Sequence, residues 1–203
     1  MNQHETDVIN LFISHGIVLY KIEEKKNQKT PDFFSTRGGK MSLFELKTRE
    51  GEEKLSNEKE KILNSGGVYD HADYRNINTG NKKAALESID LSVEQLKSGR
   101  NDFISDYNFI IFDLKDIHKK LTKERLIKTL FGMGDVTYTK EKSTHSKRCL
   151  YLHESSFYNH KDILDGVFFY ITDQLTLLVN PFSVHYNKLI KGRMFKNISK
   201  DNR

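Results

Sequence analysis

The sequence predicts an α/β fold in which helices flank a central mixed sheet. Short apolar segments with the two-residue alternation of strands are separated by segments in which apolar residues recur at helical spacing. The chain has 203 residues, the length of one domain with a substantial core. Its 36% hydrophobic residues include 13 Phe and 9 Tyr, which argues against global disorder.

The first expected elements are a short helix and three strands. Residues 8–13 are mostly apolar and are followed by Gly16, which predicts a helix that ends there. Gly38 and Gly39, between two strand-like segments, predict a hairpin turn. Three neighbouring antiparallel strands are the simplest arrangement, over residues 17–22, 31–35 and 41–47.

The next elements are a long helix and a buried strand. Residues 48–61 are mostly charged or polar and predict a solvated helix or loop. After the turn-like residues 78–81, apolar positions recur at helical spacing up to Gly99, which predicts a helix over residues 82–98. The apolar run 107–114 is typical of a buried strand. Further on we expect a helix over 116–131, strands over 149–152, 166–172 and 175–179, and a frayed basic tail over 188–203.

The charge and the cysteine content limit the classes of binding partner and the cellular compartment that we expect. The net charge of +5 and the pI near 9.1 favour a polyanionic partner, because each Lys or Arg that meets a phosphate releases condensed counterions. The single cysteine, Cys149, excludes an intramolecular disulfide and a zinc site built on several thiolates. The first residues of the sequence lack a basic region followed by an apolar run, and no segment approaches the roughly 20 apolar residues that span a bilayer. We therefore expect a cytoplasmic protein without a membrane partner.

Three charged residues near the hairpin form the strongest candidate site. In the strand 41–47 the period of two places Glu45 and Lys47 on one face. The hairpin would bring Asp32 back beside Glu45, so that two carboxylates and an ammonium share one site. Carboxylate oxygens suit Mg²⁺, which neutralises phosphoryl oxygens and lowers the pKa of a bound water. A nearby lysine can orient that water or stabilise the transition state.

The order Pro31-Asp32, hairpin, Glu45-Leu46-Lys47 resembles the signature of the PD-(D/E)xK nuclease superfamily, which has a restriction-endonuclease-like fold. The element order is similar too: a helix, a three-stranded meander, a second helix and a fourth strand. The resemblance covers roughly residues 1–114, which we expect to form the nuclease core. Residues 115–203 are expected to continue the same domain and to contribute to substrate binding.

The resemblance implies a role for each motif residue. Asp32 and Glu45 would be metal ligands for Mg²⁺, with Mn²⁺ as a substitute, and the backbone carbonyl of Leu46 would be a third ligand. Lys47 would be the catalytic lysine. The glutamate that many members carry on the first helix corresponds to Glu5, and the glutamine on the helix after the motif corresponds to Gln95.

The expected activity is endonucleolytic hydrolysis of DNA. An RNA-cleaving, toxin-like nuclease and a catalytically inactive nucleic-acid-binding module of the same fold are the alternatives. Glu-x-Lys alone also arises on exposed strands. Duplex cleavage with one active site per chain suggests a homodimer. Residues expected to contact nucleic acid are Arg37, Lys40, Lys82, Arg100, Lys147 and Arg148.

Two other clusters are weaker candidates. His145, Cys149 and His153 lie four residues apart, as zinc ligands on a helix would, but the intervening residues alternate as in a strand. Residues 70–74 contain Asp and His without the order that metal-dependent phosphohydrolases need. We interpret both clusters as ordinary surface, core or loop residues.

Overall fold

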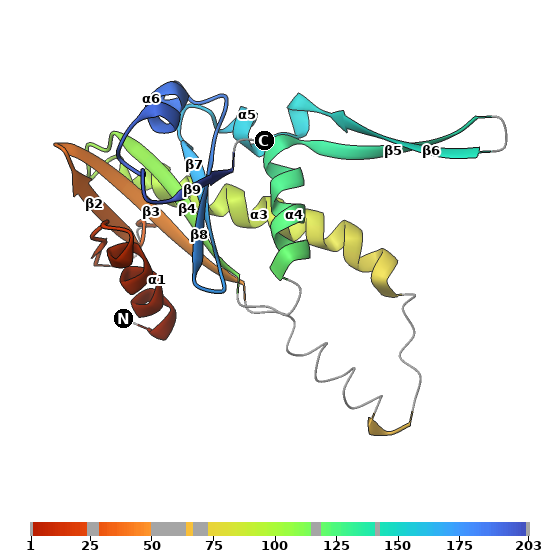
Figure 1. Ribbon diagram of the computed structural model, residues 1–203, viewed down its shortest axis with the longest axis horizontal. Coiled ribbons are helices and arrows are strands. Elements are labelled where there is room, and N and C mark those ends of the chain that lie inside the picture. The colour runs from red at the N-terminus through yellow and green to blue at the C-terminus, as the bar shows by residue number, and fades with distance from the viewer. Residues whose placement is uncertain are drawn as a thin grey trace.

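The computed structural model describes residues 2–23, 29–49, 64–66, 73–114, 119–140 and 143–201. Over these residues the fold is α/β, with helices on both faces of a seven-stranded mixed sheet (Figure 1). The strands follow one another in the order β1-β2-β3-β4-β7-β8-β9. This confirms the expected α/β class with a mixed central sheet. No helix in the described part of the chain is both long and apolar enough to cross a membrane.

The N-terminal elements are a helix and an antiparallel meander, as expected. Helix α1 (Gln3–Ser14) is followed by β1 (Tyr20–Lys21), β2 (Phe33–Arg37) and β3 (Lys40–Arg49). Neighbouring strands of this meander pair antiparallel. Between β2 and β3, Gly38 and Gly39 have φ angles of +58° and +72°, which glycine adopts without strain in a two-residue hairpin turn.

Along the chain, helix α3 (Asp73–Gly99) comes after β3 and before β4 (Tyr107–Leu114). β3 and β4 are neighbours in the sheet and pair in parallel. The expected start of this helix at residue 82 was wrong, because the helix continues through residues 78–81. A helix-interior glycine costs only about 1 kcal/mol relative to alanine, so Gly80 does not end so long a helix. Strand β4 has the expected bounds, and all of its residues are buried.

The segment after β4 forms a helix and a separate hairpin. Helix α4 (Lys119–Phe131) leads into β5 (Met133–Lys140) and β6 (Ser143–Leu150), which pair with each other and project away from the main sheet (Figure 1). Strand β5 was not expected, because its sequence lacks a continuous apolar alternation. The strand expected over 149–152 ends at Leu150, since its partner strand begins at Met133. The helical turn η1 (Leu152–Glu154) follows.

The C-terminal elements extend the main sheet beyond β4. They are α5 (Ser156–Asn159), β7 (Gly166–Ile171), β8 (Gln174–Val179), α6 (Tyr186–Lys191) and β9 (Ser199–Asp201). β7 pairs in parallel with β4, β8 antiparallel with β7, and β9 in parallel with β8. The expectation of a frayed tail was therefore wrong for residues 188–201, while residues 202 and 203 lie outside the described part of the chain. The tail is held because Phe195 and Ile198 are buried and Lys200 Nζ donates to the Leu189 and Ile190 carbonyls at 2.7 Å.

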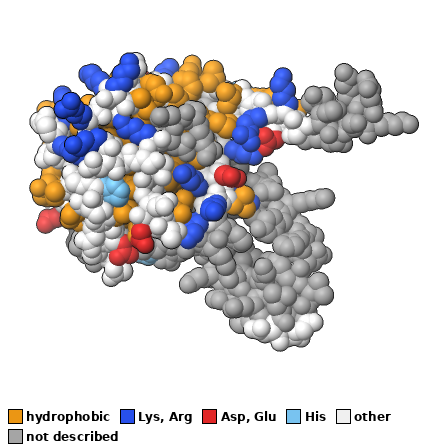
Figure 2. Space-filling view, viewed as in Figure 1, with side chains coloured by type: hydrophobic (Ala, Val, Ile, Leu, Met, Phe, Trp, Pro, Cys, Tyr) orange, Lys and Arg blue, Asp and Glu red, His pale blue; other side chains and the backbone are white. Residues whose placement is uncertain are grey.

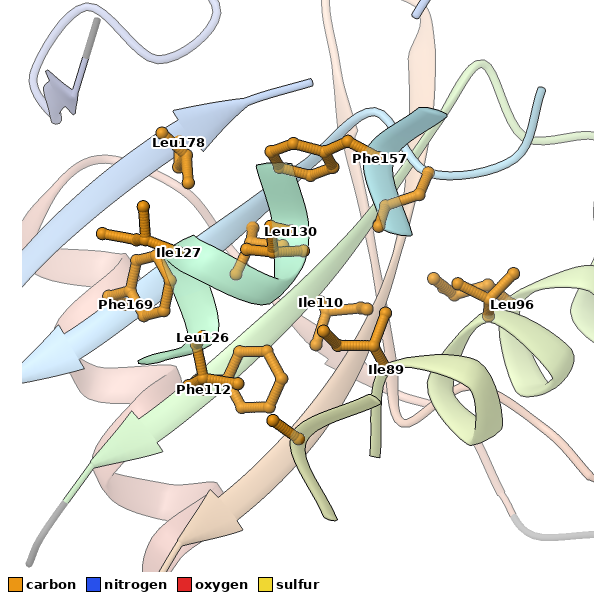
Figure 3. Close-up of a cluster of buried hydrophobic side chains, with 14 of the residues drawn as sticks. Ile89, Leu96, Ile110, Phe112, Leu126, Ile127, Leu130, Phe157, Phe169 and Leu178 are labelled. Carbon is orange, nitrogen blue, oxygen red and sulfur yellow. The ribbon is translucent and has the colours of Figure 1, made fainter. Parts of the chain in front are cut away.

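The core has two layers, one on each face of the sheet. On one face α3 and α4 pack against alternate residues of β4 and β7, including Ile110, Phe112 and Phe169 (Figure 3). On the other face α1 packs against the intervening residues of the same strands. Both helices that carry candidate site residues, α1 and α3, are thus fixed to the sheet by buried side chains.

Candidate active site

Asp32 lies just before the first residue of β2, beside the part of β3 that continues past β2. The register pairs Phe33 with Phe44, whereas β3 continues to Arg49. Beyond that point Asp32 Oδ2 accepts a hydrogen bond from the backbone N–H of Leu46 at 2.8 Å. Pro31, just before Asp32, has no N–H to donate and suits the start of a strand. The Asp32 carboxylate thus takes the place of a strand partner for β3.

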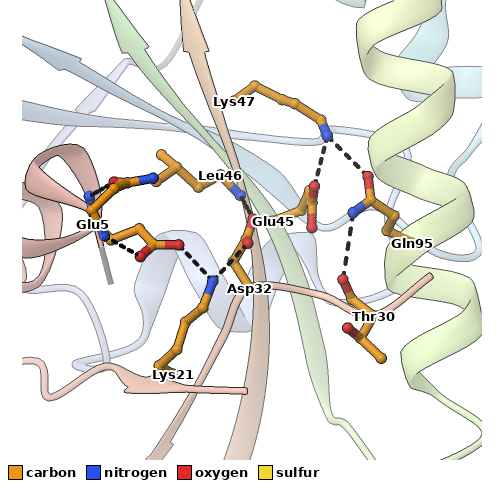
Figure 4. A network of polar contacts seen from close by, with 9 residues as sticks. Glu5, Lys21, Thr30, Asp32, Glu45, Leu46, Lys47 and Gln95 are labelled. Carbon is orange, nitrogen blue, oxygen red and sulfur yellow. Dashed lines mark hydrogen bonds and ion pairs between the residues drawn. The ribbon is translucent and has the colours of Figure 1, made fainter. Parts of the chain in front are cut away.

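Glu45 and Lys47 lie on the α3 face of β3, the arrangement that the alternation predicts. Lys47 Nζ donates to Glu45 Oε1 at 2.7 Å and to Gln95 Oε1 at 2.9 Å (Figure 4). Gln95 Nε2 in turn donates to the carbonyl of Thr30 at 3.4 Å. Gln95 therefore joins the lysine on β3 to the segment that carries Asp32.

A glycine at the end of α3 lets this helix approach that segment. A Cβ atom at Gly99 would collide with the ring of Pro31 and come within 3.4 Å of Leu43 Cδ1. Gly99 lies one turn beyond Gln95 on α3. The close approach of helix and proline therefore helps to fix the distance between Gln95 and the Asp32 segment.

The carboxyl group of Glu45 is buried and only half satisfied. The residue is 1% exposed, and no described group donates a hydrogen bond to its Oε2, although a protonated Glu45 can itself donate to Asp32. Burial, followed by the nearby charge of Asp32, raises the pKa of Glu45 to about 8, although Lys47 opposes the shift. A buried oxygen without a partner is costly. It suits a cation that binds between Glu45 and Asp32.

Glu5 reaches the site from the opposite face of the sheet. It belongs to a capping box at the start of α1, in which Glu5 Oε2 accepts from the Asn2 N–H at 2.8 Å. Glu5 Oε1 accepts from Lys21 Nζ at 2.7 Å, and Lys21 Nζ also donates to Asp32 Oδ1 at 3.0 Å (Figure 4). Burial opposes ionisation of Glu5, but the hydrogen bonds from Lys21 and Asn2 outweigh it and lower the pKa of Glu5.

Lys21 is a site residue that the sequence interpretation missed. Burial alone would lower its pKa, but the hydrogen bonds to Glu5 and Asp32 outweigh burial, so the pKa of Lys21 is raised. A signal was present in the alternation. Lys21 shares the inward-facing positions of the buried residues Ile17 and Leu19, and a lysine at such a position needs an anionic partner.

The atoms that could hold a divalent cation are carboxylate oxygens of Asp32 and Glu45 and the Leu46 carbonyl. The N–H and C=O of one strand residue point to the same edge, so the Leu46 carbonyl faces the edge at which its N–H meets Asp32. The described residues contain no group of three or more His, Cys, Asp or Glu side chains arranged for a metal. Asp32, Glu45 and Leu46 instead offer two carboxylates and one carbonyl, which are oxygen donors that suit Mg²⁺.

Several expected nucleic-acid contacts lie away from this site. Arg37 and Lys40, at the far end of the β2–β3 hairpin, line an open pocket with Arg193 and Lys196. Figure 2 shows Lys and Arg side chains gathered over the part of the molecule where this hairpin and α6 lie in Figure 1. Arg37 Nη1 donates to the Met194 carbonyl at 2.7 Å, and Lys40 Nζ contacts Asp106 at 2.6 Å.

The remaining basic candidates differ in how free their charges are. Arg100 Nη1 donates to the Asp162 carbonyl at 3.1 Å, and its Nε is buried. On β6, Lys147 is exposed, whereas Arg148 Nε contacts Asp135 at 3.4 Å. Lys82 lies in α3, but its side chain is outside the described part of the structure.

The two weaker clusters are only partly described. Cys149 is half-buried on β6 and His153 lies in η1, while the side chain of His145 is outside the described residues. In the second cluster, residues 70–72 are outside the described residues altogether. Residues 73 and 74 begin α3, but their side chains are not described.

The raised pKa of Glu45 makes stability depend on pH. In the unfolded chain this carboxyl titrates near its ordinary value of about 4.3, whereas in the metal-free native protein it keeps its proton up to about 8. Stability from this group is therefore full below the unfolded value and is lost as pH rises through 8. Glu45→Gln stays neutral at every pH. Between pH of about 4.3 and 8 in EDTA, the free energy of unfolding of wild type should therefore fall relative to that of Glu45→Gln by up to about 1 kcal/mol per pH unit.

Urea denaturation of both proteins between pH 5 and 9 measures this difference. A difference between Glu45→Gln and wild type that does not change with pH would contradict the assignment of a raised pKa to Glu45.

Comparison of the chain with protein-family models, with curated proteins and with solved structures finds no match.

Proposed function

We propose that this protein is a Mg²⁺-dependent nuclease that hydrolyses phosphodiester bonds, with DNA as the favoured substrate, and that its core is restriction-endonuclease-like. One observation carries the proposal: the buried Glu45 carboxyl, whose Oε2 receives no hydrogen bond from any described group, lies close to Asp32, with Lys47 fixed beside it. The order of α1, the meander, α3 and β4 supports it as well.

Asp32, Glu45 and the Leu46 carbonyl would hold Mg²⁺, which when bound neutralises phosphoryl oxygens and increases the acidity of water. Glu45 must give up its proton to bind the ion, so Mg²⁺ affinity should increase as pH approaches 8. Lys21 Nζ and the Leu46 N–H each donate a hydrogen bond to Asp32 and hold its side chain in place.

Lys47 would stabilise negative charge on the phosphoryl group in the transition state. Its ammonium is directed by Glu45 and Gln95, so little reorganisation is needed at the moment of reaction. Gln95 is therefore a positioning residue, since it acts through Lys47 and through its contact with Thr30.

Magnesium dependence tests the proposal. The full chain should nick supercoiled plasmid DNA in the presence of MgCl₂ and stop in excess EDTA. Cleavage of single-stranded RNA but not of plasmid would reassign the substrate. A shift of DNA on a native gel, equal with Mg²⁺ and with EDTA and without any cleavage, would indicate the inactive binding module and contradict nuclease activity.

The β5–β6 hairpin is a candidate surface for the nucleic-acid backbone. It projects from the body of the molecule and carries the exposed Lys147 (Figure 1). The neighbouring Arg148 shares Asp135 with Lys128, whose Nζ contacts this carboxylate at 2.6 Å. Part of the charge of Arg148 is therefore already neutralised within the protein, and Lys147 should contribute more to phosphate contacts.

Replacing Lys147 and Arg148 together with Glu should weaken DNA binding at low salt. The slope of log affinity against log salt should flatten by about one to two units, because each lost phosphate contact releases about one counterion fewer. Lys147→Glu alone should account for most of the change. Fluorescence anisotropy at several salt concentrations measures the slope, and cleavage at saturating substrate should be unaffected.

The matched control replaces Arg193 and Lys196, in the pocket beside Arg37, with Glu. It changes the net charge of the protein by the same amount. If the control flattens the slope and the hairpin variant leaves it unchanged, the nucleic acid follows the pocket and the hairpin contact is contradicted.

A further inference from the structure

Lys21 brings three elements together through one ammonium group. Its Nζ lies 2.7 Å from Glu5 Oε1 of α1 and 3.0 Å from Asp32 Oδ1, just before β2. The same Nζ lies 5.1 Å from the ring centroid of Phe33, within the range of a cation–π contact. The ammonium is therefore held from three sides.

The two carboxylates that share this ammonium are largely withdrawn from solvent. The side chain of Glu5 is 12% exposed and that of Asp32 is 22% exposed. Two partly buried carboxylates on one cation are also the donors that a divalent ion would use. The Lys21 ammonium thus occupies a position with the donor chemistry of a cation site.

This position lies on the far side of Asp32 from Glu45. Asp32 Oδ1 accepts a hydrogen bond from Lys21 Nζ. The charge of Asp32 also acts on Glu45, whose pKa it raises. In two-metal nucleases the ions lie about 4 Å apart and share a carboxylate. Here an ion between Asp32 and Glu45 would have Lys21 as its neighbour across the shared carboxylate.

We propose that Lys21 is a built-in cation that fills the second-ion position between Glu5 and Asp32, so that the site takes one divalent ion per chain. This inference rests on the proposed function, since it presumes a first ion at Asp32 and Glu45. Glu5 then serves as a partner of Lys21 rather than as a metal ligand. Lys21 is a positioning residue, which acts on the substrate only through Asp32.

Counting bound Mn²⁺ tests this inference without measuring activity. Electron paramagnetic resonance of free Mn²⁺ during titration of the full chain gives the number of ions bound at saturation. Wild type should bind one. Lys21→Met removes the charge but keeps an apolar stem of similar length over Phe33, and it should bind two because Glu5 and Asp32 are left without their shared cation.

Three further variants isolate the cause. Lys21→Arg keeps a cation and should bind one ion. The double variant Lys21→Met/Glu5→Gln removes a ligand of the opened position and should return to one ion. Lys29→Ala removes a lysine from an exposed ion pair with Glu94, at 2.7 Å, and should stay at one ion.

The ion counts decide whether Lys21 occupies the second-ion position. Two ions on wild type, or one ion on a folded Lys21→Met protein, would overturn the role of Lys21 while leaving the proposed metal site intact. If Lys21→Met does not fold, as judged by circular dichroism, Lys21→Gln, which also removes the charge, takes its place and should bind two ions. No Mn²⁺ on wild type would contradict the proposed function itself.

Discussion

Asp32→Asn and Glu45→Gln should each abolish cleavage while leaving the fold intact. Each substitution preserves side-chain volume but removes a negative charge from the pair that would hold the cation. A metal ion contributes several kcal/mol of transition-state charge stabilisation, so we expect a loss of about 10³-fold or more in single-turnover rate. The Glu45→Gln protein should retain a cooperative unfolding transition, because its carboxyl is already protonated in the metal-free protein at neutral pH.

The matched control for these variants is Glu94→Gln. Glu94 is a carboxylate in an ion pair on α3, next to Gln95 in sequence, but it is exposed and contacts Lys29. Its loss should leave the rate near that of wild type. If Asp32→Asn or Glu45→Gln cleaves as fast as the control in a preparation free of contaminating nuclease, the site is misassigned.

Lys47→Met should lower the single-turnover rate by about 10²-fold or more, with little change in affinity for nucleic acid. Lys47 is fixed by Glu45 and Gln95, so its ammonium can act on the transition state. Binding depends on many phosphate contacts, of which Lys47 would be one. Rapid-quench measurements at saturating protein give the rate, and anisotropy in Ca²⁺ gives the affinity.

The two parameters separate the possible roles of Lys47. A variant that loses affinity but keeps its rate at saturation would make Lys47 a phosphate contact and contradict its catalytic role. Gln95→Leu should show a smaller loss of rate than Lys47→Met, because it removes the support of the lysine rather than the lysine itself.

The elements that bury a regular face could be predicted from sequence, and the others could not. β4 is buried on both faces, so its continuous apolar run has the observed bounds. The β2–β3 hairpin follows from Gly38 and Gly39, which the turn requires. The pairing of β5 with β6 leaves no such pattern, because this hairpin does not join the main sheet. The C-terminal tail is held in place by contacts with residues distant in sequence, such as the contacts of Phe195 in the core.

The candidate site was predictable where it follows strand alternation. Glu45 and Lys47 share a face because they are two residues apart, and Gln95 lies near the buried stripe of α3 that packs on that face. The place of Lys21 in the site depends on tertiary structure, since its partners Glu5 and Asp32 come from α1 and from the residue before β2. The strand alternation marks Lys21 as inward-facing, but local spacing in the sequence does not identify its partners.

Asp32 and Glu45 together should bind a divalent ion, and the proposed function depends on this step above all others. Crystals of the full chain grown with Mn²⁺ and measured for anomalous scattering test it most directly. We expect an anomalous peak in contact with a carboxylate oxygen of Asp32, with Glu45 Oε2 and with the Leu46 carbonyl, at about 2.2 Å from each. A well-ordered site at saturating Mn²⁺ without a peak there, or with Glu45 Oε2 still unligated, would contradict the proposal.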